Sequence, residues 1–206
     1  KKDVTLKSAD LSKPYDGTAL TNENTPLAVE SGWVEGEGAT YNFTGSQTLV
    51  GASANAFTYT VNEGTKLENY NVTKTEGTLT VTNREAKYEV EITAKSLNTT
   101  YNGNEQSVSG FVNETADGTP VTADGRTYYV TGLTSEASGT DVADSVSEIP
   151  YTGTAVVKDA AGNDVSAQFN VKVNRGSLTI NKKDVTLKSA DLSKPYDGTA
   201  LTNENT

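Results

Sequence analysis

The sequence contains no cysteine, no histidine and no methionine. Without cysteine there can be no disulfide, no thiol nucleophile and no cysteine-ligated zinc. Without histidine the chain lacks the commonest general base and the commonest ligand for transition metals. Neither a Ser/His/Asp nor a Cys/His catalytic set can therefore form, and we expect no enzyme activity and no cofactor.

Long apolar runs and basic clusters are also missing. No stretch approaches the ~20 apolar residues that a membrane-spanning helix needs. The net charge is −10, and lysines and arginines never form a run longer than two. Because nucleic-acid binding needs a concentrated basic surface, we expect no nucleic-acid partner. Because a long apolar run is missing, we expect no insertion into a membrane. We find no signal peptide or sorting signal, so we expect an internal piece of a longer chain.

What the sequence does contain is a long repeat. Residues 1–25 are identical to residues 182–206, at a distance of 181 positions. Such identity indicates a tandem array, and residues 182–206 are then the start of the next unit. Because so short a segment cannot form a core alone, we expect the residues after about Ser189 to be poorly ordered unless a neighbour holds them.

A weaker copy divides the period into two related modules. Tyr15-Asp16-Gly17 is echoed by Tyr101-Asn102-Gly103, 86 positions later, whereas the module ends around Gly77 and Gly176 are 99 positions apart. We therefore predict module A over 1–84 and a longer, divergent module B over 85–181. The extra residues are expected in loops between residues 111 and 150.

Apolar residues alternate with polar ones, as in Val4/Leu6, Phe57/Tyr59/Val61 and Tyr88/Val90/Ile92. A period of two is typical of strands with one face on a core and the other in water. Hydrophobic residues make up only 34% of the chain, which favours thin cores in small modules. We predict an all-β fold of two tandem Ig-like β-sandwich modules in an elongated array. A β-grasp-like module is the alternative, and it would need one helix per module.

Each module is expected to close with a hairpin. Strand-like segments 70–74 and 78–82 flank Thr75-Glu76-Gly77, and segments 169–173 and 177–180 flank Asn174-Arg175-Gly176. A three-residue connection ending in glycine fits a turn with its last residue in the left-handed region. Gly77 and Gly176 are therefore predicted to be structural turn residues that need a positive φ.

The Tyr-Asp-Gly motif is also predicted to be a structural turn. Asp-Gly and Asn-Gly are both favoured where two residues need positive φ, and the Asp16/Asn102 exchange keeps the turn while losing the charge. The tyrosine ring is expected on the edge of a core. The motif occurs three times, as Tyr15-Asp16-Gly17, Tyr101-Asn102-Gly103 and Tyr196-Asp197-Gly198.

These motifs carry a family resemblance. Pro14–Thr18, Asn69–Val72 and Glu76–Val81, in that order, resemble the YDG/MBG-type tandem repeats of large surface proteins of Gram-positive (Firmicutes) bacteria. The resemblance implies an extracellular all-β stalk or adhesin arm, attached to the bacterial cell wall through a region outside this chain. Module B departs from the pattern at Asn102.

Three functions fit such a repeat. The first is a structural stalk that projects an adhesive tip, with neighbouring repeats as its partners. The second is an adhesin module that itself binds a host glycan or matrix protein, with repetition supplying avidity. The third is a filament subunit that assembles by strand addition through residues 182–206.

A few residues are candidates for binding or cross-linking. Trp33, the single tryptophan, is a candidate to stack on a sugar ring. Asp159, Asn163 and Asp164 are candidate calcium ligands, as are Asp141 and Asp144, although neither set has a twelve-residue calcium loop. The family resemblance also raises a Lys–Asn isopeptide bond, but Lys7 and Lys95 alternate out of phase with the apolar residues and should point to water.

Overall fold

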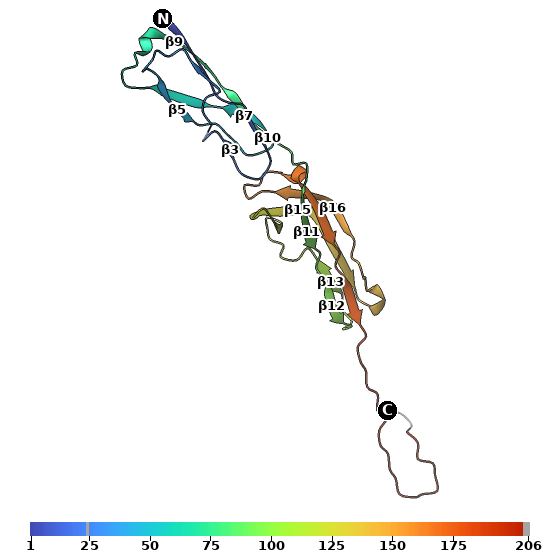
Figure 1. The fold of residues 1–206 in the computed structure, drawn as a ribbon. Coiled ribbons are helices and arrows are strands. Elements are labelled where there is room, and N and C mark those ends of the chain that lie inside the picture. The colour runs from blue at the N-terminus through green and yellow to red at the C-terminus, as the bar shows by residue number, and fades with distance from the viewer. Residues whose placement is uncertain (24, 204–206) are drawn as a thin grey trace.

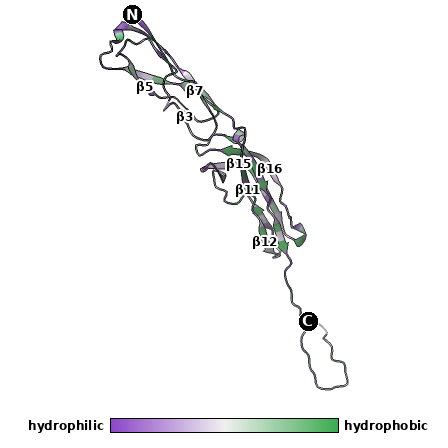
Figure 2. Ribbon diagram, viewed as in Figure 1, coloured by the Kyte–Doolittle hydropathy of each residue, from purple (hydrophilic) through white to green (hydrophobic). Residues whose placement is uncertain are grey.

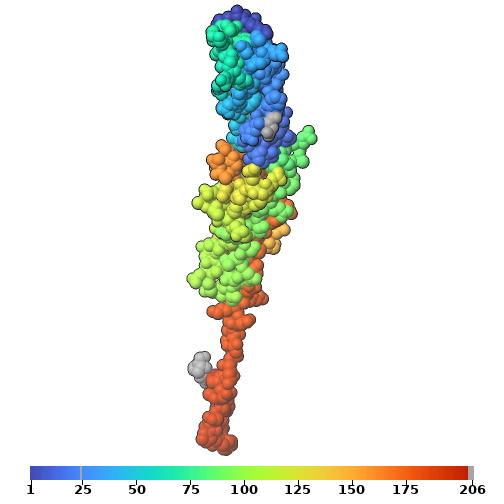
Figure 3. All heavy atoms as spheres, turned by 60° about the vertical axis from the view of Figure 1, so that its left-hand side comes forward, coloured from blue at the N-terminus to red at the C-terminus, as the bar shows by residue number. Residues whose placement is uncertain are grey.

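The computed structural model describes residues 1–23 and 25–203. It is elongated, with two β-rich bodies end to end followed by an extended C-terminal segment (Figure 1, Figure 3). Every strand pairing joins residues within 2–82 or within 88–181. We call the body of residues 2–82 module A and that of residues 88–181 module B, and the segment 83–87 links them.

Module A is built from short strands. They are β1 (Lys2–Lys7), β2 (Leu11–Pro14), β3 (Leu20–Thr21), β4 (Val29–Ser31), β5 (Ala39–Phe43), β6 (Ser46–Gln47), β7 (Gly51–Asn55), β8 (Phe57–Val61), β9 (Tyr70–Thr75) and β10 (Gly77–Thr82). In β1 the expected alternation is present, because Val4 and Leu6 are buried while Asp3 and Thr5 are exposed.

Module B repeats this plan with fewer, longer strands. They are β11 (Tyr88–Thr93), β12 (Leu97–Thr100), β13 (Gln106–Ser109), β14 (Thr119–Ala123), β15 (Arg126–Gly139), β16 (Tyr151–Lys158), β17 (Phe169–Asn174) and β18 (Leu178–Asn181). The expectation of loops over 111–150 is wrong in part, since β14 and the 14-residue β15 lie there and form an antiparallel pair.

The all-β prediction is confirmed for the described residues. The only helical segments there are three 3₁₀ turns, η1 (Leu67–Asn69), η2 (Val142–Asp144) and η3 (Ser166–Gln168). The β-grasp alternative is wrong, because it requires a helix in each module.

The first and last strands of each module pair in parallel. In module A, six register pairs join β1 to β9 and four join β2 to β10. In module B, six pairs join β11 to β17 and four join β12 to β18. Each module therefore begins at one end of a parallel strand pair and finishes at the opposite end.

The predicted closing hairpins are wrong. Strands β9 and β10 do not pair with each other but follow one another in the same direction, and β17 and β18 do the same. The chain shifts there from one sheet to the next, from β4-β1-β9 to β2-β10-β7 in module A. A sequence pattern of strand, three residues and strand does not distinguish a reversal from such a shift, because both interrupt the alternation for a few residues.

Gly77 and Gly176 are needed for close approach and not for a positive φ. Neither is among the glycines with positive φ. A Cβ on Gly77 would lie 2.4 Å from the carbonyl oxygen of Ala9, and one on Gly176 would lie 2.0 Å from that of Lys95. The two parallel strands thus come so close at the shift that only glycine fits.

Two facing layers enclose each core. In module A, Val4 and Leu6 from β1 and Tyr70 from β9 pack with Phe57 from β8. In module B, β11 residues pack against β14, β15 and β16 in the largest cluster. The hydrophobic residues lie mostly on the strands (Figure 2).

The described part of the C-terminal segment, 182–203, contains no strand and extends away from module B. Its sequence equals that of residues 1–22, yet Leu187 is 91% exposed whereas the identical position Leu6 is 0% exposed. The burial of Leu6 is thus supplied by the rest of module A, which the repeated segment lacks here.

Candidate functional site: the junction between the modules

The junction begins at the Tyr-Asp-Gly turn of module A. The turn follows β2 directly, and the Tyr15 N–H donates a 2.9 Å hydrogen bond to the carbonyl of Thr82, the last residue of β10. Tyr15 is 1% exposed, and its ring belongs to the same cluster as Tyr128 and Phe169 of module B. A residue of module A thus completes the core of module B, a relationship that the sequence analysis did not identify.

The turn itself is held by a side chain. The Oδ1 atom of Asp16 accepts a 2.8 Å hydrogen bond from the Thr18 N–H, and Oδ1 of Asn102 accepts one of 2.9 Å from the Asn104 N–H. Among these residues only the glycine has positive φ, 74° at Gly17. The expectation of two positive-φ residues is therefore wrong, and Asp and Asn are interchangeable because both carry an oxygen that closes an Asx turn.

The other two copies of the turn lack the packing. Gly103 and Gly198 have φ of 80° and 78°, and Asp197 accepts a 2.9 Å hydrogen bond from the Thr199 N–H. The tyrosines, however, are exposed, Tyr101 by 38% and Tyr196 by 98%. The turn is thus a local structure, whereas burial of its tyrosine depends on a neighbouring module.

Arg84 connects the two modules through the linker. Its guanidinium Nη1 donates a 3.0 Å hydrogen bond to the carbonyl of Tyr15, and its Cζ lies 4.0 Å from the ring centroid of Tyr88. The Arg84 N–H donates a 2.9 Å bond to Oε1 of Gln168, whose amide nitrogen donates to Oδ1 of Asn83. Because Gln168 is only 2% exposed, the linker is anchored to a buried side chain of module B.

Two tyrosines of the junction, Tyr15 and Tyr88, have a raised pKa. Burial raises the pKa of Tyr15 far above its ordinary value. Burial, together with a hydrogen bond to Asp124, raises the pKa of Tyr88 to about 12.

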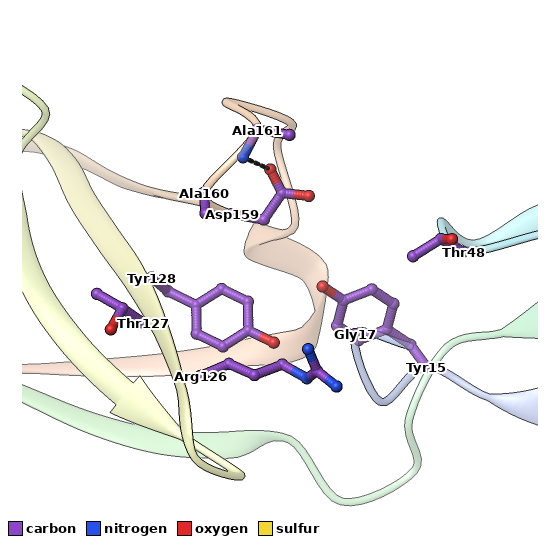
Figure 4. Close-up of a pocket in the computed structure, with 9 residues that line it drawn as sticks. All are labelled: Tyr15, Gly17, Thr48, Arg126, Thr127, Tyr128, Asp159, Ala160 and Ala161. Atoms are coloured by element: carbon purple, nitrogen blue, oxygen red, sulfur yellow. Dashed lines mark hydrogen bonds between the residues drawn. The ribbon is translucent and has the colours of Figure 1, made fainter. Parts of the chain in front are cut away.

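A pocket of about 480 Å³ opens at this junction. The Tyr15 and Tyr128 rings face each other across it with their hydroxyls pointing inward, and the Arg126 side chain lies alongside (Figure 4). Module A contributes Tyr15, Gly17 and Thr48, and module B contributes Arg126, Thr127, Tyr128, Asp159, Ala160 and Ala161. Both modules are needed to form it.

Trp33 lies at the far end of module A. Its ring is half-buried and meets Tyr70 edge-on, with centroids 4.9 Å apart. Its Nε1 donates a 3.4 Å hydrogen bond to the Tyr41 hydroxyl. The indole is therefore part of the small core there, and sugar stacking on it stays a prediction.

The candidate calcium residues are occupied with turn hydrogen bonds. Asp159 accepts bonds from the Ala161 and Asn163 N–H groups, and Asp164 accepts one from Ser166. Asp144 likewise accepts from the N–H groups of residues 140 and 141. Across residues 1–23 and 25–203, no group of three or more acidic, His or Cys side chains is placed to hold a metal ion.

The candidate isopeptide lysines both lie at the surface. The Lys7 ammonium lies 3.5 Å from the Asp10 carboxylate, and its side chain is 40% exposed. Lys95 is exposed. This arrangement matches the outward direction expected from the strand alternation.

Three residues of the junction, Arg84, Tyr128 and Gln168, were not predicted from the sequence. The one local signal for Arg84 is a cationic, planar side chain four residues before an aromatic strand start at Tyr88. Gln168 and Tyr128 have no such signal, because their contacts join residues 84 and 113 positions apart in sequence.

In the part of the chain that is described, no helix is long and apolar enough to cross a membrane. Comparison with protein-family models, curated proteins and solved structures finds no match to this chain.

Proposed function

We propose that this chain is a load-bearing structural repeat, a spacer that holds an adhesive tip away from a bacterial cell surface. The observation that carries the proposal is the parallel pairing of the first and last strands in both modules. The family resemblance of the repeats supplies the location on the cell surface. We also propose that each two-layered module is Ig-like.

The pairing determines how each module meets tension. Pulling on both ends of module A draws β1 and β2 one way and β9 and β10 the other, along the strand direction. Hydrogen bonds that join strands side by side then share the load and must break together. A strand peeled from one end loses its bonds one after another, at lower force.

The junction suits the same role. The short linker, the buried Tyr15 ring and the Arg84 contacts oppose bending between A and B, so that an array transmits force along its axis. The junction pocket is compatible with this role, since it lies between the two parts that must stay aligned.

Single-molecule force spectroscopy tests the proposal. Because the chain has no cysteine, attachment points can be introduced one pair at a time. Lys1→Cys with Lys182→Cys pulls both modules along their terminal strands, whereas Lys1→Cys with Glu68→Cys pulls β1 away from the start of β9. At the same loading rate we expect a several times higher unfolding force for the first pair, because forced unfolding depends on the barrier along the pulling direction. Equal forces would overturn the load-bearing function.

A further inference from the structure

We propose that the C-terminal end of module B is a docking surface for the N-terminal end of a following module A. The surface consists of Tyr101, Asp141 and Val142, and its occupant is a second copy of module A, whose first residues are 182–206. The inference rests on the proposed tandem spacer, and names the contact that continues it beyond one period.

The first observation is the equivalence of Tyr101 and Tyr15. Each N–H donates a 2.9 Å hydrogen bond to the carbonyl of the last residue of its module's final strand, Thr82 for Tyr15 and Asn181 for Tyr101. The two tyrosines therefore occupy the same place at the C-terminal ends of modules A and B. Tyr15 is buried by the module that follows it, whereas Tyr101 is 38% exposed.

The second observation is an apolar hollow around Tyr101. A pocket of about 430 Å³ is lined by Tyr101, Asp141 and Val142 of module B together with Lys182, Lys183 and Val185 of the repeated segment. Val142 is 37% exposed. Val185 is 76% exposed, although Val4, which occupies the same position in the first copy of the repeat, is buried in module A. The hollow is continuous with the place where the next module would begin.

The third observation is the length of the connection. Five residues, 83–87, separate β10 from β11 at the A–B junction. In the repeated copy Lys183 corresponds to Lys2, the first residue of β1. The first strand of the next module would therefore begin only one residue, Lys182, after the end of β18. Two residue steps reach at most about 7 Å, which places the next module directly against the end of module B.

The facing end of module A also carries exposed apolar side chains among charged ones. At this N-terminal end Val34 is 47% exposed and Leu67 is 43% exposed. Exposed apolar side chains on both surfaces are covered when the two ends meet, which is the driving force for their contact.

Cysteine accessibility tests the docking. Tyr101→Cys and, as a second variant, Val142→Cys are compared in the chain of 206 residues and in one extended after Thr206 by the sequence of residues 26–84. We expect thiol labelling of both to slow by about tenfold or more in the extended chain. Thr154→Cys, exposed on the side of β16, is the matched control and should label equally in both chains.

Amide hydrogen exchange over residues 183–195 reports separately whether the third module has folded. These amides could become protected while the thiols of the Tyr101→Cys and Val142→Cys variants stay as reactive as before. That result would overturn the proposed docking surface and leave the proposed spacer function intact. If the amides exchange freely in the extended chain, the tandem array and the docking both fall. Neither readout depends on unfolding force, so failure of the load-bearing function is recognised independently.

Discussion

Arg84, in the linker between the modules, donates a 3.0 Å hydrogen bond to the main-chain carbonyl of Tyr15 in module A. The acceptor is a backbone atom at the start of the Tyr-Asp-Gly turn, and the ring of the same residue fills the core of the other module. One residue of module A is thus held by both the linker and the interior of module B.

Replacing this arginine should loosen the junction. We expect Arg84→Ala to lower the free energy of unfolding by about 1–3 kcal/mol, since a charge-assisted hydrogen bond and a cation–π contact are lost together. Urea unfolding measures the loss, and small-angle scattering should show a broader distribution of angles between the modules. Arg175→Ala is the matched control, because Arg175 also lies over a tyrosine and pairs with Glu148, but far from the junction. An equal change in the scattering of both variants would contradict the role of Arg84.

Removing the buried ring of Tyr15, a residue of module A, should destabilise module B. For Tyr15→Ala we expect a loss of about 3 kcal/mol or more, as for other large-to-small changes in a core. Hydrogen exchange should rise in β11 and β15 as well as in β2 and β10. Tyr101→Ala, at the equivalent but exposed position, should change the stability of the 206-residue chain by only about 0.5 kcal/mol. If exchange in module B is unaffected by Tyr15→Ala, the shared core is not real.

The strand shift at Gly176 should reject every side chain. A Cβ there would lie 2.0 Å from the Lys95 carbonyl oxygen, so both Gly176→Ala and Gly176→Asn should cost about 1–3 kcal/mol or more. The Asn variant distinguishes a glycine that is needed for a positive φ from one that is needed for close packing. Asn tolerates a positive φ, but its side chain has no room here. Gly103→Asn is the control, since Gly103 has φ of 80° with room for a Cβ. A thermal melt in which Asn is tolerated equally at both positions would favour the hairpin instead.

Acid should weaken the turn at Asp16. Desolvation there acts to raise the pKa, but hydrogen bonds from Lys13 and Thr18 outweigh it and lower the pKa from 3.8 to about 2. The ionised carboxylate therefore adds stability above about pH 4, and that contribution is lost as pH falls through 2. Asp16→Asn should keep the Asx turn, as Asn102 does, and reduce the fall in melting temperature between pH 4 and 2.

Asp197→Asn is the matched control for this pH series. Asp197 has the same local hydrogen bond from Thr199, but it lies in the segment without strand pairing. Its replacement should leave the melting curves of both modules unchanged at every pH. A fall in melting temperature that is identical in Asp16→Asn and the unmodified chain would show that the Asp16 carboxylate does not contribute.

Much of the organisation follows from local patterns. The alternation around Val4, Leu6 and Tyr88 predicts strands, and the repeated Tyr-Asp/Asn-Gly motifs mark the start of each module. The prediction of closing hairpins was wrong because Gly77 and Gly176 provide space for a close approach of the backbone and do not adopt a positive φ. A glycine supplies either a positive φ or the space left by a missing Cβ, and the sequence does not say which.

By itself the sequence determined the strand content and the positions of the Tyr-Asp/Asn-Gly turns, because both depend on contacts within a few residues. The period of the repeat follows from the identity of residues 1–25 and 182–206. Only the tertiary structure decided that first and last strands pair in parallel and that Tyr15 completes the core of module B. The three copies of the turn make the distinction plain. Their local hydrogen bonds agree, but the tyrosine is buried only where a second module packs on it, since burial requires surface from residues distant in the chain.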